Sequence, residues 1–255
     1  MIIWTRSADD WDVDQRLFSA NPEQVLRLPC IKVSPLSESD VNKQISPRFS
    51  EGSNIVTVFT SAHGAEMFHG LKKVRSIVKR SGACYAVGPF TRNRLQSFTV
   101  DATVPTGVSK GKDLADWLIN EFSGQDVQFL LPGGRLRAFN LERALRNNGF
   151  DAFNLNLYET KSGCWGADEQ ELSQETKLKH REIFKSGVLC FASPSAVRGF
   201  ARFWDFTGAE LGRWKAVAIG SSTEQACREF FRRVKKADQP SLESLKITAE
   251  KFHKL

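Results

Sequence analysis

Two stretches of this 255-residue chain, VTVFTSAHGAEMF at 56–68 and VLCFASPSAVRGF at 188–200, determine its fold class. Each begins with a short run of apolar, β-branched or aromatic residues, which is typical of a buried strand. Each continues through Ser61 or Ser193 into a helical pattern, and a serine at this point caps a helix N-terminus. A shift of 132 residues, from 56 to 188, superimposes the two stretches without a gap. They predict a repeated strand–turn–helix unit.

The same shift extends the repeat in both directions. It places CYAVGPFT (84–91) on AVAIGSST (216–223), and a fainter pair relates residues 1–33 to residues 129–160. The chain is therefore predicted to contain two similar domains. Periodicity leaves two arrangements open: two tandem blocks, or one domain inserted into the other. In the inserted arrangement, the chain would cross between domains near 33–35 and 158–161.

Strands and helices are predicted to alternate along the whole chain. This alternation indicates an α/β fold, in which parallel sheets are flanked by helices. The apolar runs predict strands at 55–59, 83–87, 127–131, 153–158, 188–191 and 216–219. Helical periodicity covers 65–79, 111–122, 141–148, 196–204 and 223–234.

The composition is that of a globular protein, with 41% hydrophobic and 25% charged residues. It excludes a disordered or collagen-like chain, and no run of about 18–20 apolar residues predicts a membrane span. The opening MIIWTRSADD lacks the pattern of a secretory signal peptide. The net charge of +7 predicts an attraction for anions and leaves nucleic acid, a membrane surface and a polycarboxylate or phosphate ligand open.

The cysteines and histidines do not have metal-site spacing. Five widely separated cysteines without a CxxC pair are expected to be reduced, and Cys30, Cys84 and Cys190 are expected to fill the core. We expect a cytoplasmic protein without a metal, with residues 163–179 as a solvated, acidic segment. The basic run at 228–236 predicts a solvated helix face, and nucleic-acid binding is its alternative.

Five turns that follow predicted strands carry hydroxyl residues, glycine or proline. In a parallel sheet, turns that follow strands lie together at the carboxyl edge. Helix N-termini at this edge present N–H donors to anions. The sequence has no GxSxG, P-loop, GxGxxG or paired His/Cys motif. An enzyme built from these parts would use hydroxyls, backbone amides and basic side chains. The turns are TS (60–61), GPFT (88–91), PGGR (132–135), ASPS (192–195) and GSST (220–223).

In combination and in order, these motifs resemble the uroporphyrinogen-III synthase family. The resemblance rests on WTR (4–6), FTSAHGAEMF (59–68), AVGPFT (86–91), LLPGGRLRAFNLERALRNNGF (130–150), LYET (157–160), FASPSAVRGF (191–200), AIGSSTEQA (218–226) and PSLESL (240–245). It implies two α/β domains, 1–34 with 162–255 and the inserted 35–161, crossings near 33–36 and 158–162, and an active site in the cleft between them. It also implies a cofactor-free reaction in which hydroxymethylbilane loses water and closes to uroporphyrinogen III with one ring inverted.

The resemblance assigns site residues by motif position. Tyr158 matches the tyrosine proposed to assist loss of the hydroxyl group. Ala138 stands where arginine is common, so Arg135 or Arg137 would replace it, and His63 and Ala192 also depart from the family pattern. We expect a monomer, since domain motion is expected across a small linker, with transient contact to the preceding synthase. A catalytically inactive, tetrapyrrole- or anion-binding regulatory relative is the alternative. The remaining substrate-binding positions are Ser61, Gly88, Thr91, Gly134, Ser193, Ser195, Gly220, Ser222 and Thr223.

Overall fold

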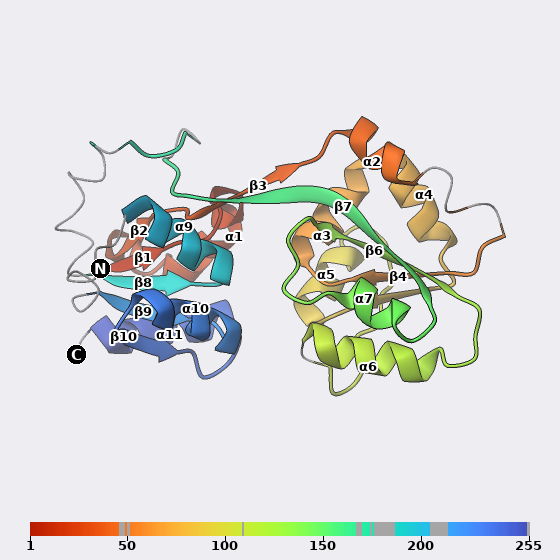
Figure 1. Ribbon diagram of the computed structural model, residues 1–255. Coiled ribbons are helices and arrows are strands. Elements are labelled where there is room, and N and C mark those ends of the chain that lie inside the picture. Colours follow the sequence, from red (N-terminus) through yellow and green to blue (C-terminus); the bar gives the residue numbers. More distant parts are fainter. Residues whose placement is uncertain are drawn as a thin grey trace. The chain divides into compact units, whose positions relative to one another are not determined.

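The computed structural model describes residues 1–45, 49, 52–108, 110–166, 170–173, 175, 187–204 and 214–253. Contacts between residues divide the chain into two units, each built on one five-stranded sheet (Figure 1). Unit 1 comprises Met1–Val33 and Thr160–Leu255, and unit 2 comprises Ser34–Glu159. The chain passes from one unit to the other in β3 (Ile31–Pro35) and β7 (Asp151–Ser162).

The sheet of unit 1 has the strand order β10-β9-β8-β1-β2, and its described pairings are parallel. Its strands are β1 (Ile2–Trp4), β2 (Val25–Arg27), β8 (Val188–Phe191), β9 (Lys215–Ala218) and β10 (Arg233–Lys236). The α-helices whose bounds lie in the described ranges are α1 (Trp11–Asp14), α9 (Pro194–Trp204), α10 (Ser221–Phe230) and α11 (Leu242–His253). Short 3-10 helices lie at Ala8–Asp10, Gln15–Phe18 and Pro22–Gln24.

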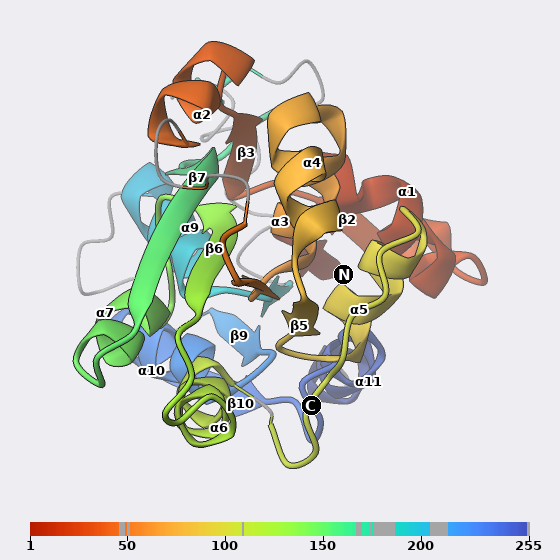
Figure 2. The same ribbon diagram turned by 90° about the vertical axis from the view of Figure 1, so that its right-hand side faces the viewer.

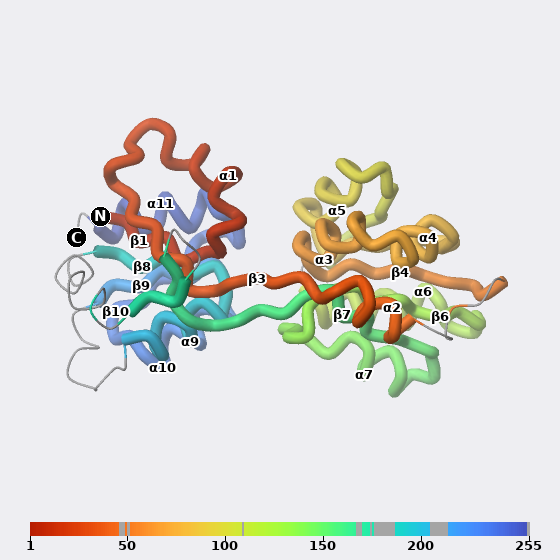
Figure 3. Tube along the Cα trace, turned by 90° about the horizontal axis from the view of Figure 1, so that it is seen from above, coloured from red at the N-terminus to blue at the C-terminus, as the bar shows by residue number. Residues whose placement is uncertain are grey.

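Alternating side chains give this sheet two apolar faces. Ile3 and Leu189 pack with Phe200 of α9 in one core cluster that also includes α10. Ile2 and Val188 face the other way and pack with α11. Figure 3 shows α9 and α10 on one side of the strands and α11 on the other. Parallel strands covered on both faces explain why β8 reads as a continuous apolar run.

The sheet of unit 2 has the order β3-β7-β6-β4-β5 (Figure 2). Helices α6 and α7 cover the face that carries Val56 and Phe129, while Phe59 packs on Phe68 on the other side. The remaining strands are β4 (Ile55–Phe59), β5 (Ala83–Ala86) and β6 (Gln128–Gly134). The helices are α2 (Glu38–Ile45), α3 (Ala62–Met67), the 3-10 turn Phe68–Gly70, α4 (Lys72–Arg80), α5 (Pro89–Gln96), α6 (Gly111–Glu121) and α7 (Leu141–Arg146).

The structure confirms the internal repeat and the α/β fold class. Strands β4 and β5 pair at Val56 and Ala83, and β8 and β9 pair in the same register at Val188 and Lys215. Helices α3 and α9, and likewise α5 and α10, begin at positions related by the same shift of 132 residues. The fainter pair is also supported, because β1 lies beside β8 as β6 lies beside β4.

Two helix predictions were wrong. The single helix predicted over 65–79 is interrupted at Gly70–Leu71, where the 3-10 turn ends and α4 begins. The helix predicted over 223–234 ends at Phe230, because Phe231 is buried and the open edge of β9 then pairs with β10. The basic residues at 233–236 thus lie on an edge strand, where positive charge discourages pairing with other chains. Much of the predicted acidic segment, 167–169, 174 and 176–179, lies outside the described residues.

Helix α9 packs through Gly199 against the residue before β3 and the residue after β7. A Cβ atom at this position would overlap the carbonyl oxygen of Cys30 and lie 2.8 Å from the backbone nitrogen of Gly163. Both neighbours are backbone atoms, which cannot rotate away. The close approach of α9 therefore requires glycine.

We predict that Gly199→Ala lowers the free energy of unfolding by about 1–3 kcal/mol, as overpacking does elsewhere. Urea unfolding followed by circular dichroism would measure the loss. The matched control is Gly70→Ala, because no atom lies within 4 Å of the added methyl group. Equal stability of the two variants would contradict the close packing of α9 on Cys30.

Candidate functional site

The predicted site residues gather at the carboxyl edges of the two sheets. In unit 2, β4 leads to Ser61, β5 leads to the turn at 88–91, and β6 ends at Gly134. In unit 1, β8 and β9 lead to the equivalent turns at 192–195 and 220–223. Since parallel strands all end at the same edge, each sheet presents its turns together.

A β-bulge orients Tyr158. Gly133 pairs with Asn156, but the next residue, Gly134, pairs with Tyr158, so β7 gains one residue relative to β6. This extra residue brings Tyr158, rather than Leu157, opposite Gly134. The ring then lies across Gly134, where an added Cβ would be 2.5 Å from a ring carbon.

The Tyr158 hydroxyl meets Ser61 at the start of α3. The two side-chain oxygens are 3.0 Å apart, although the residues are 97 positions apart in the sequence. Ser61 Oγ also accepts a hydrogen bond from the backbone N–H of Gly64 at 3.1 Å, which caps the helix. The His63 ring lies 5.9 Å from the Tyr158 ring, between centroids. Only 6% of Tyr158 is exposed, so its hydroxyl is held in a defined position.

Residues 12–246 match the family model described as "Uroporphyrinogen-III synthase HemD". The chain belongs to the uroporphyrinogen-III synthase family.

Solved structures of this family have the same fold. The chain is similar to the uroporphyrinogen-III synthetase of Helicobacter pylori, with a TM-score of 0.65, 16% identity and coverage of 98% of each chain. It is also similar to a mutant uroporphyrinogen III synthase of the extremely thermophilic bacterium Thermus thermophilus, with a TM-score of 0.64 and 14% identity, over 99% of this chain and 98% of that one. No curated protein sequence matches the chain.

In this member of the synthase family, Arg137 turns toward the sheet. Its Nη2 donates to the carbonyl oxygens of Leu131 at 3.2 Å and Leu155 at 3.5 Å. Burial lowers the pKa of the guanidinium below its usual value, and interactions with Tyr158 and Glu142 oppose the shift. Arg137 thus bonds to carbonyl groups within β6 and β7.

Arg135 faces solvent and forms an ion pair with Glu159. Its backbone N–H donates to the carbonyl oxygen of Tyr158 at 3.0 Å, which continues the pairing of the two strands beyond the bulge. The side chain of Arg135 is 57% exposed, so an anion can reach it by competing with one carboxylate. Of the two predicted arginines, Arg135 is the accessible one.

The N-cap residues of α5 and α10 are glycines with unoccupied space around them. Gly88 and Gly220 have extended backbone (φ −169° and −163°), and an added Cβ would meet no atom within 4 Å. Neither backbone strain nor packing therefore requires glycine at these positions. The predicted hydroxyl residues differ in access, because Thr91 and Thr223 are buried in the first helical turn while Ser222 is exposed.

In unit 1, the equivalent of Ser61 acts as a helix cap. Ser193 Oγ accepts from the backbone N–H of Ala196 at 3.2 Å, and Ser195 is half-buried in the first turn of α9. The structure gives Ser193 no tyrosine partner among the described residues comparable to Tyr158. Both copies of the repeat thus contain the serine cap, but only the cap in unit 2 contacts a tyrosine among the described residues.

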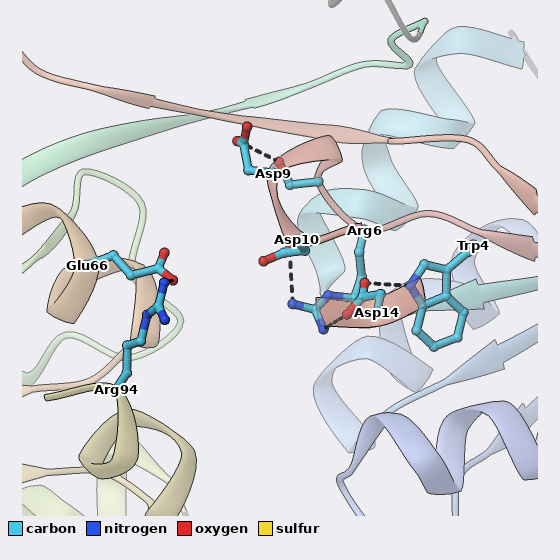
Figure 4. Close-up of polar contacts among 8 residues, drawn as sticks. Trp4, Arg6, Asp9, Asp10, Asp14, Glu66 and Arg94 are labelled. Atoms are coloured by element: carbon cyan, nitrogen blue, oxygen red, sulfur yellow. Dashed lines mark hydrogen bonds and ion pairs between the residues drawn. The ribbon is translucent and has the colours of Figure 1, made fainter. Parts of the chain in front are cut away.

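The family-like WTR motif forms a closed ionic network in unit 1 (Figure 4). Arg6 pairs with Asp10 at 3.0 Å and with Asp14 at 2.9 Å, and Asp14 also accepts from the Trp4 indole N–H at 2.7 Å. Burial raises the pKa of the Asp14 carboxyl, against the opposing effects of Arg6 and Trp4. Because two carboxylates already neutralise Arg6, we assign it to holding α1 on the end of β1.

Two exposed apolar side chains of unit 2 were not predicted as site residues. Phe90, in the first turn of α5, is 61% exposed, and Leu136, just after β6, is 64% exposed. They flank turns that carry predicted binding residues. Sequence hydrophobicity does not distinguish such residues from those of the core, and only burial reveals them.

The residues that the structure describes contain no group of three His, Cys, Asp or Glu side chains able to hold a metal ion. No helix in the described ranges is long and apolar enough to cross a membrane. All five cysteines are free; Cys30 and Cys190 are buried as predicted, and Cys84 is half-buried.

The Ser61–Tyr158 contact can be measured by a double-mutant cycle. We predict that Ser61→Ala lowers the free energy of unfolding by about 0.5–2 kcal/mol through loss of the cap. Tyr158→Phe should cost about 1 kcal/mol in the wild-type background and little in the Ser61→Ala background, because the hydrogen bond is then already lost. The control is Ser193→Ala, which removes a cap alone and should add to Tyr158→Phe. Additivity of Ser61→Ala with Tyr158→Phe would show that the hydroxyls do not interact.

Proposed function

We propose that this chain is a uroporphyrinogen-III synthase, which cyclises hydroxymethylbilane to uroporphyrinogen III with loss of water and inversion of the terminal ring. The observation that carries the proposal is the Tyr158 hydroxyl, held by Ser61 at the carboxyl edge of a sheet in a member of this family. A phenol in this position can donate a proton to a leaving hydroxyl group.

The hydrogen bonds suggest how Tyr158 is oriented. Ser61 Oγ accepts from the Gly64 N–H, so the Ser61 proton can point at the Tyr158 oxygen. This arrangement leaves the Tyr158 proton for the substrate. It also stabilises the phenolate that forms when the proton is transferred, because a fixed donor faces the new charge.

The reaction then needs little further acid–base chemistry. As Tyr158 protonates the hydroxymethyl group, the C–O bond breaks, water leaves and the pyrrole nitrogen supplies the electron pair of an azafulvene. The far ring attacks through its substituted carbon and gives a spiro intermediate. One bond of this intermediate cleaves and re-forms at the other position, which inverts the ring. The final loss of a ring proton balances the proton that Tyr158 gave, so one water is released overall.

The remaining task of the protein is to position a substrate with eight carboxylates. We assign carboxylate binding to the backbone amides near Gly88, Gly134 and Gly220, to the hydroxyls of Ser193, Ser195 and Ser222, and to Arg135. The open space at Gly88 and Gly220 supports this assignment, since an anion can approach the start of each helix closely. Phe90 and Leu136 would contact the apolar faces of the pyrrole rings.

The domain boundaries and the setting of the enzyme complete the proposal. We propose domains 1–34 with 162–255 and 35–161, a cytoplasmic location and a monomeric enzyme that receives its unstable substrate by transient contact with the preceding synthase. Free cysteines at all five positions are consistent with a reducing compartment.

An isomer assay tests the activity. Hydroxymethylbilane supplied by the preceding enzyme should give type III porphyrin after oxidation and chromatography. Tyr158→Phe should reduce the rate by roughly 10²-fold, at the lower end of what a positioned acid contributes. The other tyrosine of the chain provides the control: Tyr85→Phe changes a ring that packs on Trp117 and should leave the rate unchanged.

Each alternative has its own outcome. Type I porphyrin alone, formed at the spontaneous rate, would identify a catalytically inactive, anion-binding relative. An unchanged rate in Tyr158→Phe would remove this residue from the mechanism while leaving the activity in place. Salt-sensitive DNA binding tighter than about 10⁻⁴–10⁻⁶ M would support the nucleic-acid alternative.

A further inference from the structure

Two cysteines meet where the chain enters and leaves unit 1. Cys30 immediately precedes β3, and Cys164 lies two residues beyond the end of β7. Their Sγ atoms are 3.4 Å apart, both residues are 0% exposed, and neither forms a disulfide. They are 134 positions apart in the sequence, so their proximity depends on the fold.

The backbone around the two cysteines fixes them as neighbours. The Gly163 N–H donates to the Cys30 carbonyl at 3.2 Å, and the Trp165 N–H donates to the Pro29 carbonyl at 2.9 Å. The residue numbers rise on one segment as they fall on the other, so the segments run in opposite directions with Cys30 close to Cys164. The two sulfur atoms, 3.4 Å apart, would have to approach to about 2.05 Å to form a disulfide bond.

The hydrogen positions can be assigned from the contacts of Cys30. Its thiol donates to the Leu28 carbonyl oxygen at 3.1 Å, so the Cys164 thiol is the donor between the two sulfurs. Burial and the neighbouring Cys164 together raise the pKa of the Cys30 thiol well above its usual value. Because both residues are 0% exposed, an oxidant reaches this pair only when the two segments open.

We infer that Cys30 and Cys164 form a redox-modification site, at which a peroxide converts the dithiol into a disulfide. The thiolate of one cysteine attacks hydrogen peroxide, which breaks the O–O bond and gives a sulfenic acid and, after protonation, water. The second thiol attacks the sulfenic sulfur, and a second water leaves. Overall, the two thiols lose two electrons and two protons, and one hydrogen peroxide is reduced to two waters.

The disulfide would have a defined structural effect. It would join the residue before β3 to the segment just after β7 and would close a covalent loop that contains all of unit 2. Such a loop restricts the unfolded chain and holds the bases of both crossing strands together. Oxidation should therefore stabilise the attachment of these strands to unit 1. The inference does not depend on the proposed activity.

Thiol counting and mass spectrometry on the full chain test the site. After treatment with hydrogen peroxide, we expect the number of titratable thiols to fall from five to three. The intact mass should fall by about 2 Da, for two hydrogens lost. Peptide mapping should link the peptides that contain Cys30 and Cys164, and dithiothreitol should restore five thiols. The thermal midpoint of the oxidised protein should rise and return on reduction.

Serine variants supply the controls. Cys30→Ser and Cys164→Ser should each abolish the cross-link, while Cys84→Ser, which removes a half-buried cysteine, should retain it. If a serine variant fails to fold, the mapping and reversibility of the wild-type cross-link still decide. The inference would be overturned by mass gains of oxygen at Cys30 without a link, by a link to another cysteine, or by oxidant levels that modify Cys84 but leave Cys30 and Cys164 as free thiols. The pair would then serve as core packing.

Discussion

The β-bulge at Gly133–Gly134 is the constraint on which the candidate site depends. It adds one residue to β7 and so places Tyr158, rather than Leu157, opposite Gly134. The Tyr158 hydroxyl lies 3.0 Å from Ser61 Oγ in this arrangement. The bulge also requires glycine at 134, because the Tyr158 ring occupies the space of a side chain there. One irregularity in a parallel ladder thus sets the orientation of the phenol and the residue beneath it.

The duplicated architecture explains why the two units can differ in chemistry while sharing a scaffold. Both contain a strand, a serine cap and a helix in equivalent positions, with cap distances of 3.1 and 3.2 Å. In unit 2 the capping oxygen also meets Tyr158, whereas in unit 1 the equivalent helix packs through Gly199 onto the crossing segment. In both units the serine oxygen accepts a hydrogen bond from a backbone N–H. Its second lone pair or its own proton is then available for a second hydrogen bond.

Local sequence patterns predicted the elements that are buried on both faces. Strands β4 and β8 have the predicted bounds, because continuous apolar runs mark central parallel strands. Strands β2 and β10 were not predicted as strands, since they are short, exposed and stabilised by pairing with neighbours. The candidate site was likewise predictable only where local patterns define it. The turns could be placed from the repeat, but the meeting of Ser61 with Tyr158 and the turn of Arg137 onto carbonyls depend on contacts between distant segments.

Arginine side chains are less available to an anionic ligand than the backbone amides at the starts of α5 and α10. Arg6 and Arg135 lie near sheet edges, but each pairs with carboxylates, and Arg94 pairs with Glu66 at 2.5 Å (Figure 4). Each of these arginines thus already has a carboxylate partner within the protein. The backbone at Gly88 and Gly220 is unobstructed by comparison. It is extended at both residues, and a side chain would fit there. Both copies of the repeat have glycine where folding permits other residues, which supports the proposed close approach of a ligand to the amides of α5 and α10.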